Sequence, residues 1–85
     1  MKKKSAYHVY ILKCCDGSLY TGIALDLARR IGEHNSSVKG ARYTKARRPV
    51  ELVYSRECAD RGTALKEELR IKGLGRDEKL KLIYN

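Results

Sequence analysis

Two tyrosines that flank a turn signal are the residues of this 85-residue chain that could most directly do chemistry. Tyr10 and Tyr20 lie in the stretch VYILKCCDGSLYTG, on either side of Asp16-Gly17. Phenols in a hairpin can pack across the strands, or they can act together as proton donors and acceptors in an active site. The second possibility requires both side chains to lie on one face of the sheet.

The length of the turn decides whether the two tyrosines share a face. A two-residue turn at the Asp-Gly pair would place Tyr20 opposite Lys13 and would point Tyr10 to the other face. A three-residue loop over 15–17, with a left-handed glycine last, would instead pair Tyr20 with Leu12. Tyr10 and Tyr20 would then share a face. Glycine stands at the required position, so the sequence permits this register.

A predicted helix that begins near Asp26 carries a second pair of candidate residues. Arg30 and His34 are four positions apart, so they project from one edge of the helix and can reach a common site. The alternative is that Arg29, Arg30 and Glu33 form an ordinary solvated face.

A later helix, predicted from near Asp60 to about Lys72, carries an acidic residue on its apolar side. Glu68 falls in the apolar arc. That arc comprises Ala64, Leu65, Leu69 and Ile71, and Thr63, Lys66, Glu67 and Arg70 lie opposite. One interpretation is a half-buried ion pair between Glu68 and Lys72, one turn later. The other is a metal ligand, because a carboxylate that leans toward the core needs a cation.

The loop between these helices is rich in cations and contains no acidic residue from position 39 to 48. Cations interleaved with an aromatic ring suit phosphate contacts and base stacking. The alternative is a solvated loop that has no ligand. The candidate contacts are Lys39, Arg42, Tyr43, Lys45, Arg47 and Arg48.

Composition indicates a polyanionic partner. The chain has 19 Lys and Arg against 10 Asp and Glu, a formal net charge of +9.

Its length suits one domain over 1–85, with a core from about 6 to 83 and a short basic tail over 1–5. The apolar run 9–12 is too short to span a membrane, and no leader peptide is recognisable, so we expect a cytoplasmic protein. Three cysteines without paired spacing indicate packing residues.

The elements that must position these residues follow from local patterns. Strands are predicted over 7–14, 19–23 and 50–55 from their β-branched and aromatic content. Helices are predicted from Asp26 to before Asn35, from Asp60 to about Lys72, and from about 76 to 83, with an irregular loop over 36–48. The order β β α β α α predicts an α+β fold, in which helices pack on a small antiparallel sheet.

These segments together resemble the GIY-YIG nuclease family. The resemblance comes from "HVY" at 8–10, "YTG" at 20–22, "LARRIGEHN" from 27, "GARYTKARRPVELVYS" from 40 and "TALKEELRIK" from 63. The small stand-alone bacterial YhbQ-like group is the nearest match, over about 7–83. The resemblance implies a three-stranded antiparallel sheet flanked by helices.

The resemblance also implies roles for the residues already singled out. The matched positions are Tyr10 and Tyr20 for the motif tyrosines, Gly22 for the motif glycine, Arg30 for the helix arginine, His34 for a polar position, and Glu68 for the ligand of one Mg²⁺ or Mn²⁺. Tyr20, or alternatively His34, would accept the proton of the attacking water, which Tyr10 would position. Arg30 would complement the phosphate, and Gly22 would leave room for the substrate backbone.

Two departures from the family pattern stand out. The first triplet is His-Val-Tyr rather than Gly-Ile-Tyr, and the region around Leu80 lacks the asparagine of the repair-nuclease branch, while Asn85 lies at the wrong spacing.

We expect a metal-dependent DNA endonuclease that is guided by the structure of duplex or branched DNA and serves repair or recombination. The alternatives are a catalytically weak or inactive nucleic-acid-binding module of the same fold, and a basic protein that associates with RNA.

Overall fold

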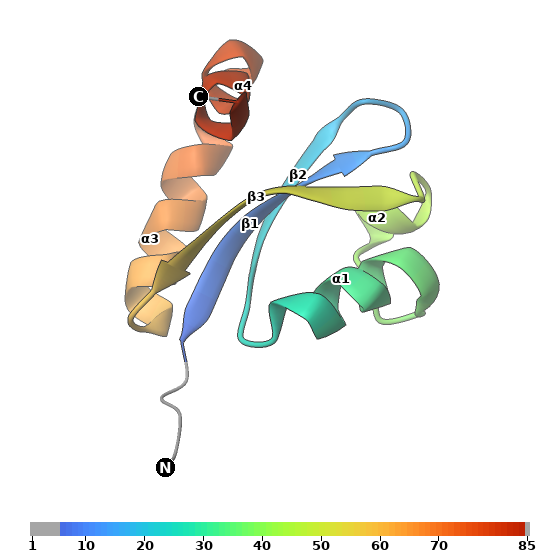
Figure 1. The fold of residues 1–85 in the computed structure, drawn as a ribbon, viewed down its shortest axis with the longest axis horizontal. Coiled ribbons are helices and arrows are strands. Elements are labelled where there is room, and N and C mark those ends of the chain that lie inside the picture. Colours follow the sequence, from blue (N-terminus) through green and yellow to red (C-terminus); the bar gives the residue numbers. More distant parts are fainter. Residues whose placement is uncertain (1–5, 85) are drawn as a thin grey trace.

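The computed structural model describes residues 6–84, so the predicted tail over 1–5 and Asn85 lie outside the described residues. Strands β1 (Tyr7–Cys14), β2 (Leu19–Ala24) and β3 (Val50–Cys58) form an antiparallel sheet in the order β2-β1-β3. Helices α1 (Leu27–Ser36), α2 (Arg42–Lys45), α3 (Arg61–Lys72) and α4 (Arg76–Tyr84) flank this sheet, with α1 and α2 on one side and α3 on the other (Figure 1). The predicted α+β class and three-stranded antiparallel sheet are confirmed.

The β1–β2 hairpin has the three-residue loop that lets the two tyrosines share a face. Gly17 adopts a φ of 86°, and its N–H donates to the carbonyl of Cys14 at 2.9 Å. Leu12 pairs with Tyr20 across the strands, as this loop requires. Tyr10 and Tyr20 therefore lie on the same face of the sheet, and this prediction is confirmed.

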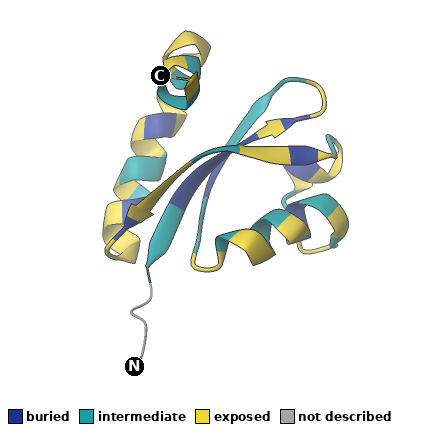
Figure 2. Ribbon diagram, viewed as in Figure 1, coloured by how far each residue is buried: buried dark blue, intermediate teal, exposed yellow. Residues whose placement is uncertain are grey.

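Strand β1 supplies both halves of the core by alternation. Val9 and Ile11 point to one face and pack with residues of α3, namely Ala64 and Ile71, and with Cys58. Tyr10 and Leu12 point to the other face, where Cys14, Val50, Leu27 and Ile31 surround them. Figure 2 shows the buried centre of β1 running between the two groups of helices.

Helix α1 is longer than we predicted, because the side chain of Asn35 forms hydrogen bonds with the backbone of β3. The Asn35 amide donates to the carbonyl of Val50 at 2.9 Å and accepts from the N–H of Val50 at 2.7 Å. This pairing holds the last turn of α1 against the start of β3. Our prediction that the helix ends before Asn35 was therefore wrong.

The loop over 36–48 is not wholly irregular, as we had predicted, because it contains the four-residue helix α2. Such a short helix has no hydrophobic periodicity to read from the sequence. The observed order of elements is therefore β β α α β α α. Strand β3 also extends past Ser55 to Cys58, and a bulge between its pairs Ile11–Tyr54 and Leu12–Leu52 explains its weak alternation.

Helix α3 begins at the predicted cap, where the Asp60 carboxylate accepts from the N–H of Thr63 at 2.7 Å. Our predicted arcs misplaced two residues of this helix. Leu69 is 70% exposed, and Glu67, which we placed on the solvent side, is half-buried between Arg56 and Arg70. The expectation that all three cysteines are packing residues also fails at Cys15, which is exposed.

Candidate active site

Tyr10 lies at the centre of the candidate site. Its side chain is 1% exposed, and its hydroxyl lies 2.8 Å from Nε2 of His34. The phenol crosses strand β2 directly over Gly22, where a Cβ atom would lie 2.6 Å from the Tyr10 hydroxyl oxygen. We expected the substrate backbone to use this space; instead Gly22 makes room for Tyr10.

His34 is joined to the loop by a residue that we did not select from the sequence. The imidazole is fully buried, and its Nδ1 lies 2.8 Å from the hydroxyl of Thr44, which is also fully buried. The Thr44 hydroxyl in turn lies 2.9 Å from the carbonyl oxygen of Ala41. The sequence gives no signal for Thr44, because its burial depends on the short helix α2.

Arg30 stands at the edge of the same cluster. Its guanidinium donates to the Glu33 carboxylate at 2.7 Å and to the carbonyl of Lys39 at 2.9 Å. A pocket of about 260 Å³ opens beside it, lined by Ile23, Ala24, Leu25, Asp26, Arg29, Arg30 and Glu33. Arg30 also acts on the pKa values of Tyr10 and His34, so this partly exposed residue is coupled electrostatically to the buried pair.

Burial and neighbouring charges fix the protonation states of the central pair. Burial raises the pKa of Tyr10 to about 12; the phenol of Tyr20 and the Glu68 carboxylate also raise this pKa, and Arg30 lowers it. Burial, and then the charge of Arg30, lowers the pKa of His34 to about 4. Both side chains are consequently neutral at pH 7.

Tyr20 continues the site toward the surface through a row of rings. Its ring lies 5.1 Å from that of His34 in an edge-on arrangement and stacks on Tyr43 at 6.0 Å. The Arg47 guanidinium lies 3.9 Å from the centre of the Tyr43 ring. Within residues 6–84 the Tyr20 hydroxyl makes no hydrogen bond. Of Tyr10 and Tyr20, it is therefore the phenol with a free hydroxyl group.

Glu68 forms the ion pair that we considered as one alternative. Its Oε2 lies 3.2 Å from Nζ of Lys72, and its side chain is 16% exposed. Its charge also acts on the phenol of Tyr10, across the sheet. The ion pair uses only one carboxylate oxygen, which leaves the other able to meet a ligand.

The donor set around Glu68 fits a hard divalent ion that keeps most of its water. Within the described part of the chain, no group of three or more His, Cys, Asp or Glu side chains could enclose a metal ion. A single carboxylate suits Mg²⁺ or Mn²⁺, whose shell is commonly completed by water and substrate phosphate. It does not suit a structural zinc site.

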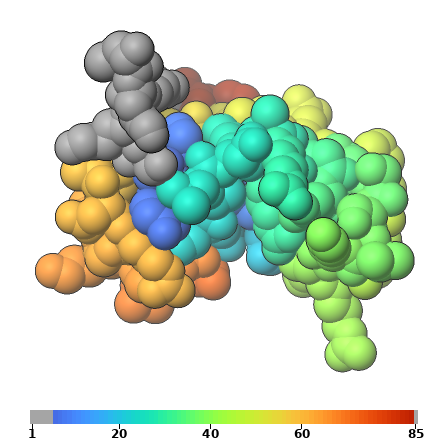
Figure 3. Space-filling view, turned by 90° about the horizontal axis from the view of Figure 1, so that it is seen from below, coloured from blue at the N-terminus to red at the C-terminus, as the bar shows by residue number. Residues whose placement is uncertain are grey.

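The predicted loop contacts divide into two groups. Arg48 donates to the backbone carbonyls of His34 and Ser37, at 2.6 Å each, and of Glu33, at 3.1 Å. Arg47 donates to the Asp16 carboxylate and to a backbone carbonyl. The side chains of three other cations form no ion pair among residues 6–84; these are Lys39, Arg42 and Lys45, on the loop that forms one end of the molecule in Figure 3.

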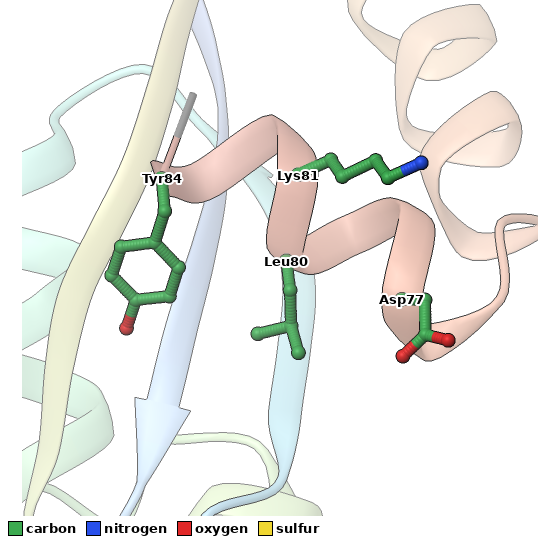
Figure 4. Close-up of a pocket in the computed structure, with 4 residues that line it drawn as sticks. All are labelled: Asp77, Leu80, Lys81 and Tyr84. Atoms are coloured by element: carbon green, nitrogen blue, oxygen red, sulfur yellow. The ribbon is translucent and has the colours of Figure 1, made fainter.

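A second pocket lies away from this site, on α4. It has a volume of about 460 Å³ and is lined by Asp77, Leu80, Lys81 and Tyr84, of which Asp77, Leu80 and Tyr84 project from the same side of the helix (Figure 4). Leu80 marks the region where we noted that the family's asparagine is missing. None of the predicted site residues lines this pocket.

The comparison with known families agrees with the geometry around Tyr10. The model of the GIY-YIG catalytic domain matches residues 6–81. The chain belongs to the GIY-YIG family. GIY-YIG nucleases act on nucleic acids and generally use divalent metal ions.

Relatives of this GIY-YIG chain are small proteins with names that state no function. It is 56% identical over 80 residues to a UPF0213 protein of Desulfotalea psychrophila, covering 94% of this chain and 73% of the relative. It is 53% identical over 77 residues to a UPF0213 protein of Staphylococcus saprophyticus, covering 91% and 93%. These matches fit the predicted stand-alone group.

Solved structures share the fold. The solution NMR structure of a UPF0213 protein from Bacillus halodurans matches with a TM-score of 0.59 and 42% identity, over 92% of this chain and 82% of that one. A second NMR structure, of a protein from E. faecalis, gives a TM-score of 0.61 and 40% identity, over 93% and 83%. Among residues 6–84, no helix is both long and apolar enough to cross a membrane.

Proposed function

We propose that this GIY-YIG chain is a metal-dependent DNA endonuclease, which hydrolyses phosphodiester bonds in duplex or branched DNA and serves repair or recombination in the cytoplasm. The observation that carries the proposal is the surroundings of Tyr10. His34 contacts its hydroxyl, Gly22 makes room for its ring, and the charges of Arg30 and Glu68 both act on its pKa. Residues from β2 and α1 therefore contact one phenol of β1, and the charge of a carboxylate on α3 also acts on it.

Each residue has a role that its surroundings favour. Tyr20 would accept the proton of the attacking water in its phenolate form, which becomes the neutral phenol. Its hydroxyl has no hydrogen-bond partner among the described residues, so the oxygen is free to face the water. His34 is less suited to this role, because it is fully buried and both of its ring nitrogens have partners. Tyr10 stays protonated at neutral pH, which suits a group that positions water rather than one that removes its proton.

Arg30 and Glu68 compensate the negative charge of the substrate phosphate, Arg30 directly and Glu68 through a metal ion. The Arg30 guanidinium borders a surface pocket, where its remaining donors can meet the phosphate as negative charge develops. Glu68 would hold a Mg²⁺ or Mn²⁺ ion, which, when bound, supplies Lewis-acid polarisation of the phosphate. Lys72 holds the carboxylate in place until then.

The exposed rim of the loop provides the contact with DNA. Lys39, Arg42 and Lys45 are exposed and form no ion pairs among residues 6–84, so they can bind phosphates. Tyr43 is 38% exposed and stacks on Tyr20, so it extends the aromatic row toward the substrate. Arg48 is omitted from this surface because backbone carbonyls already occupy its guanidinium.

The decisive experiment compares two neighbouring glutamates of α3. Labelled single-stranded, duplex, flap and four-way-junction DNA, with a single-stranded RNA alongside, is incubated with Mg²⁺ or Mn²⁺. Glu68→Ala is expected to reduce cleavage by about a hundredfold or more, because it removes the carboxylate that we propose as the metal ligand. Glu67→Ala is the matched control, since Glu67 is similarly buried but pairs with Arg56 and Arg70.

The other outcomes separate the alternatives. Binding without cleavage on every substrate would replace the proposal with an inactive nucleic-acid-binding module. Preference for RNA would favour the RNA-associated protein. Cleavage that survives in Glu68→Ala would show that the site is wrongly assigned or that the activity belongs to a contaminant.

A further inference from the structure

The hydrogen bonds that end at Thr44 constrain where the proton of His34 lies. A neutral imidazole carries one proton, on either Nδ1 or Nε2, and the partners of the two nitrogens decide which. Here both partners are hydroxyl groups, Tyr10 at Nε2 and Thr44 at Nδ1, each at 2.8 Å. Each hydroxyl can donate only one proton, so the direction of one bond fixes the direction of the next.

The Thr44 hydroxyl has a second, competing acceptor. It lies 2.9 Å from the carbonyl oxygen of Ala41. If Thr44 donates to this carbonyl, its oxygen accepts from Nδ1–H of His34, and Nε2 is left to accept from Tyr10. All three short contacts are then hydrogen bonds. The opposite arrangement would bring the oxygens of Thr44 and Ala41 together without a proton between them.

We propose that Thr44 is a positioning residue, which holds the proton of His34 on Nδ1 and thereby makes Tyr10 donate its hydroxyl proton to His34. The Tyr10 oxygen then turns its lone pairs outward, where it can accept from Arg30 and from an attacking water. In the other tautomer, Nε2–H would donate to this oxygen, and the phenol proton would point into the site. Thr44 thus decides whether Tyr10 receives water as an acceptor or as a donor.

The packing around Thr44 holds its hydroxyl in a fixed position relative to His34. Thr44 and His34 are both fully buried. A Cβ atom at Gly40 would lie 2.6 Å from the carbonyl oxygen of Glu33, so the loop approaches α1 as closely as glycine permits. Arg48 fixes the same loop by donating to the carbonyl of His34 at 2.6 Å.

The structure also predicts what happens when the Thr44 hydroxyl is removed. The N–H of Ala41 points at Nδ1 of His34 in the wild type as well, at 3.4 Å. This is the longest contact of the group and the one that the proposed tautomer leaves unsatisfied. It becomes the nearest donor to Nδ1 once the threonine oxygen has gone. In Thr44→Val, which keeps the shape of the side chain, Nδ1 becomes the acceptor and the proton moves to Nε2. Thr44→Ser keeps the hydroxyl and should keep the original tautomer.

The test reads the tautomer directly by two-dimensional ¹H–¹⁵N NMR of the histidine ring nitrogens at pH 7, with His8→Gln to assign the signals. We expect a protonated Nδ1 in the wild type and in Thr44→Ser, and a protonated Nε2 in Thr44→Val. A protonated Nε2 in the wild type would overturn the inference, even if Thr44→Val failed to fold. An unchanged tautomer in folded Thr44→Val would overturn it as well.

The catalytic consequence rests on the proposed endonuclease function, whereas the tautomer does not. Thr44→Val is expected to lower kcat by roughly 10- to 100-fold, the usual loss when the partner that orients a histidine is removed, with KM nearly unchanged and activity restored in Thr44→Ser. Equal kcat in Thr44→Val and the wild type would reject the positioning role. If the wild type cuts no DNA, the endonuclease proposal fails, while the NMR result still decides the tautomer.

Discussion

The two sides of the sheet are built from one strand but on different principles. Val9 and Ile11 of β1 meet Ala64 and Ile71 of α3 in an apolar core, where the contacts are non-directional. On the opposite side, Tyr10 begins a chain of hydrogen bonds through His34 to Thr44, in which every partner is specified. One side is therefore held by apolar packing alone, whereas the other combines an apolar cluster with a chain of buried polar groups that has a cost in stability.

The largest expected effect on stability comes from the apolar side. Ile71→Ala should lower the free energy of unfolding by roughly 2–5 kcal/mol, because Ile71 is fully buried and its loss leaves a cavity. Urea unfolding followed by circular dichroism measures this change. Leu69→Ala, on the same helix but 70% exposed, is the control and should stay within about 0.5 kcal/mol of the wild type.

If the two sides are as separate as we describe, Ile71→Ala should also leave the NMR signals of the His34 ring nitrogens unchanged at pH 7. A changed tautomer in folded Ile71→Ala would show that the apolar core helps to position the polar side, and the comparison would break down.

The pH dependence of the free energy of unfolding should reveal the cost of burying His34 on the polar side of the sheet. The pKa of His34 falls from the ordinary 6.5 to about 4 on folding. Between these values the unfolded chain binds more protons, so stability is lost as the pH falls from 6.5 toward 4. The full loss is up to about 3 kcal/mol, at about 1.4 kcal/mol per pH unit. Urea unfolding at pH 7, 6 and 5 checks this dependence.

This pH window separates His34 from the acidic residues. Hydrogen bonds and ion pairs lower the pKa of four carboxyl groups, so their contribution is lost mainly at more acidic pH, below their ordinary values; they are Asp16, Glu33, Asp60 and Glu67. His34→Gln should remove most of the slope between pH 6.5 and 5. The same slope in His34→Gln and the wild type would mean that His34 is not the group responsible.

Features set by local sequence could be predicted on both sides of the sheet, and features that depend on distant contacts could not. The β-branched run of β1 and the Asp60 cap each act locally, so they predicted the sheet and the start of α3, and the Gly17 turn allowed the observed register as one of two. Thr44 and the end of α1 at Ser36 could not be predicted in this way. Both depend on contacts between segments ten or more positions apart, such as Asn35 with Val50 and His34 with Thr44.

Helix α3 shows the same limit within a single element. Its hydrophobic pattern placed Leu69 in the core and Glu67 in solvent, yet Leu69 is exposed and Glu67 is half-buried. Ion pairs to Arg56, on β3, and Arg70 offset the cost of burying Glu67. Periodicity alone carries no information about such partners, which a neighbouring strand supplies.

The smallest effect on stability is expected on the cationic loop of the polar side. Arg42 and Arg48 test whether this loop has an exposed part that binds DNA and a buried part that holds the fold. Arg42 is exposed, without an ion pair among the described residues, whereas Arg48 is bound by three backbone carbonyls. Arg42→Ala should change stability by less than about 0.5 kcal/mol. It should weaken binding to duplexes of any sequence and reduce the slope of log K against log salt by about 0.9, the value for one phosphate contact.

Arg48→Ala makes the matched comparison, because it removes the same charge from a position six residues away on the same loop. It should lower the free energy of unfolding by about 1–3 kcal/mol, since it leaves the carbonyl of His34 without its partner and removes the bonds to the carbonyls of Glu33 and Ser37, which keep backbone N–H donors. Titrations of a fluorescent duplex at 50–200 mM salt, run without divalent ions to prevent cleavage, measure both slopes. Both variants could reduce the salt slope equally and keep the wild-type free energy of unfolding. Arg48 would then contact DNA, and its hydrogen bonds to the backbone carbonyls would break when DNA binds. If neither changes the slope, this loop does not contact phosphates, and the DNA must approach across another face of the sheet.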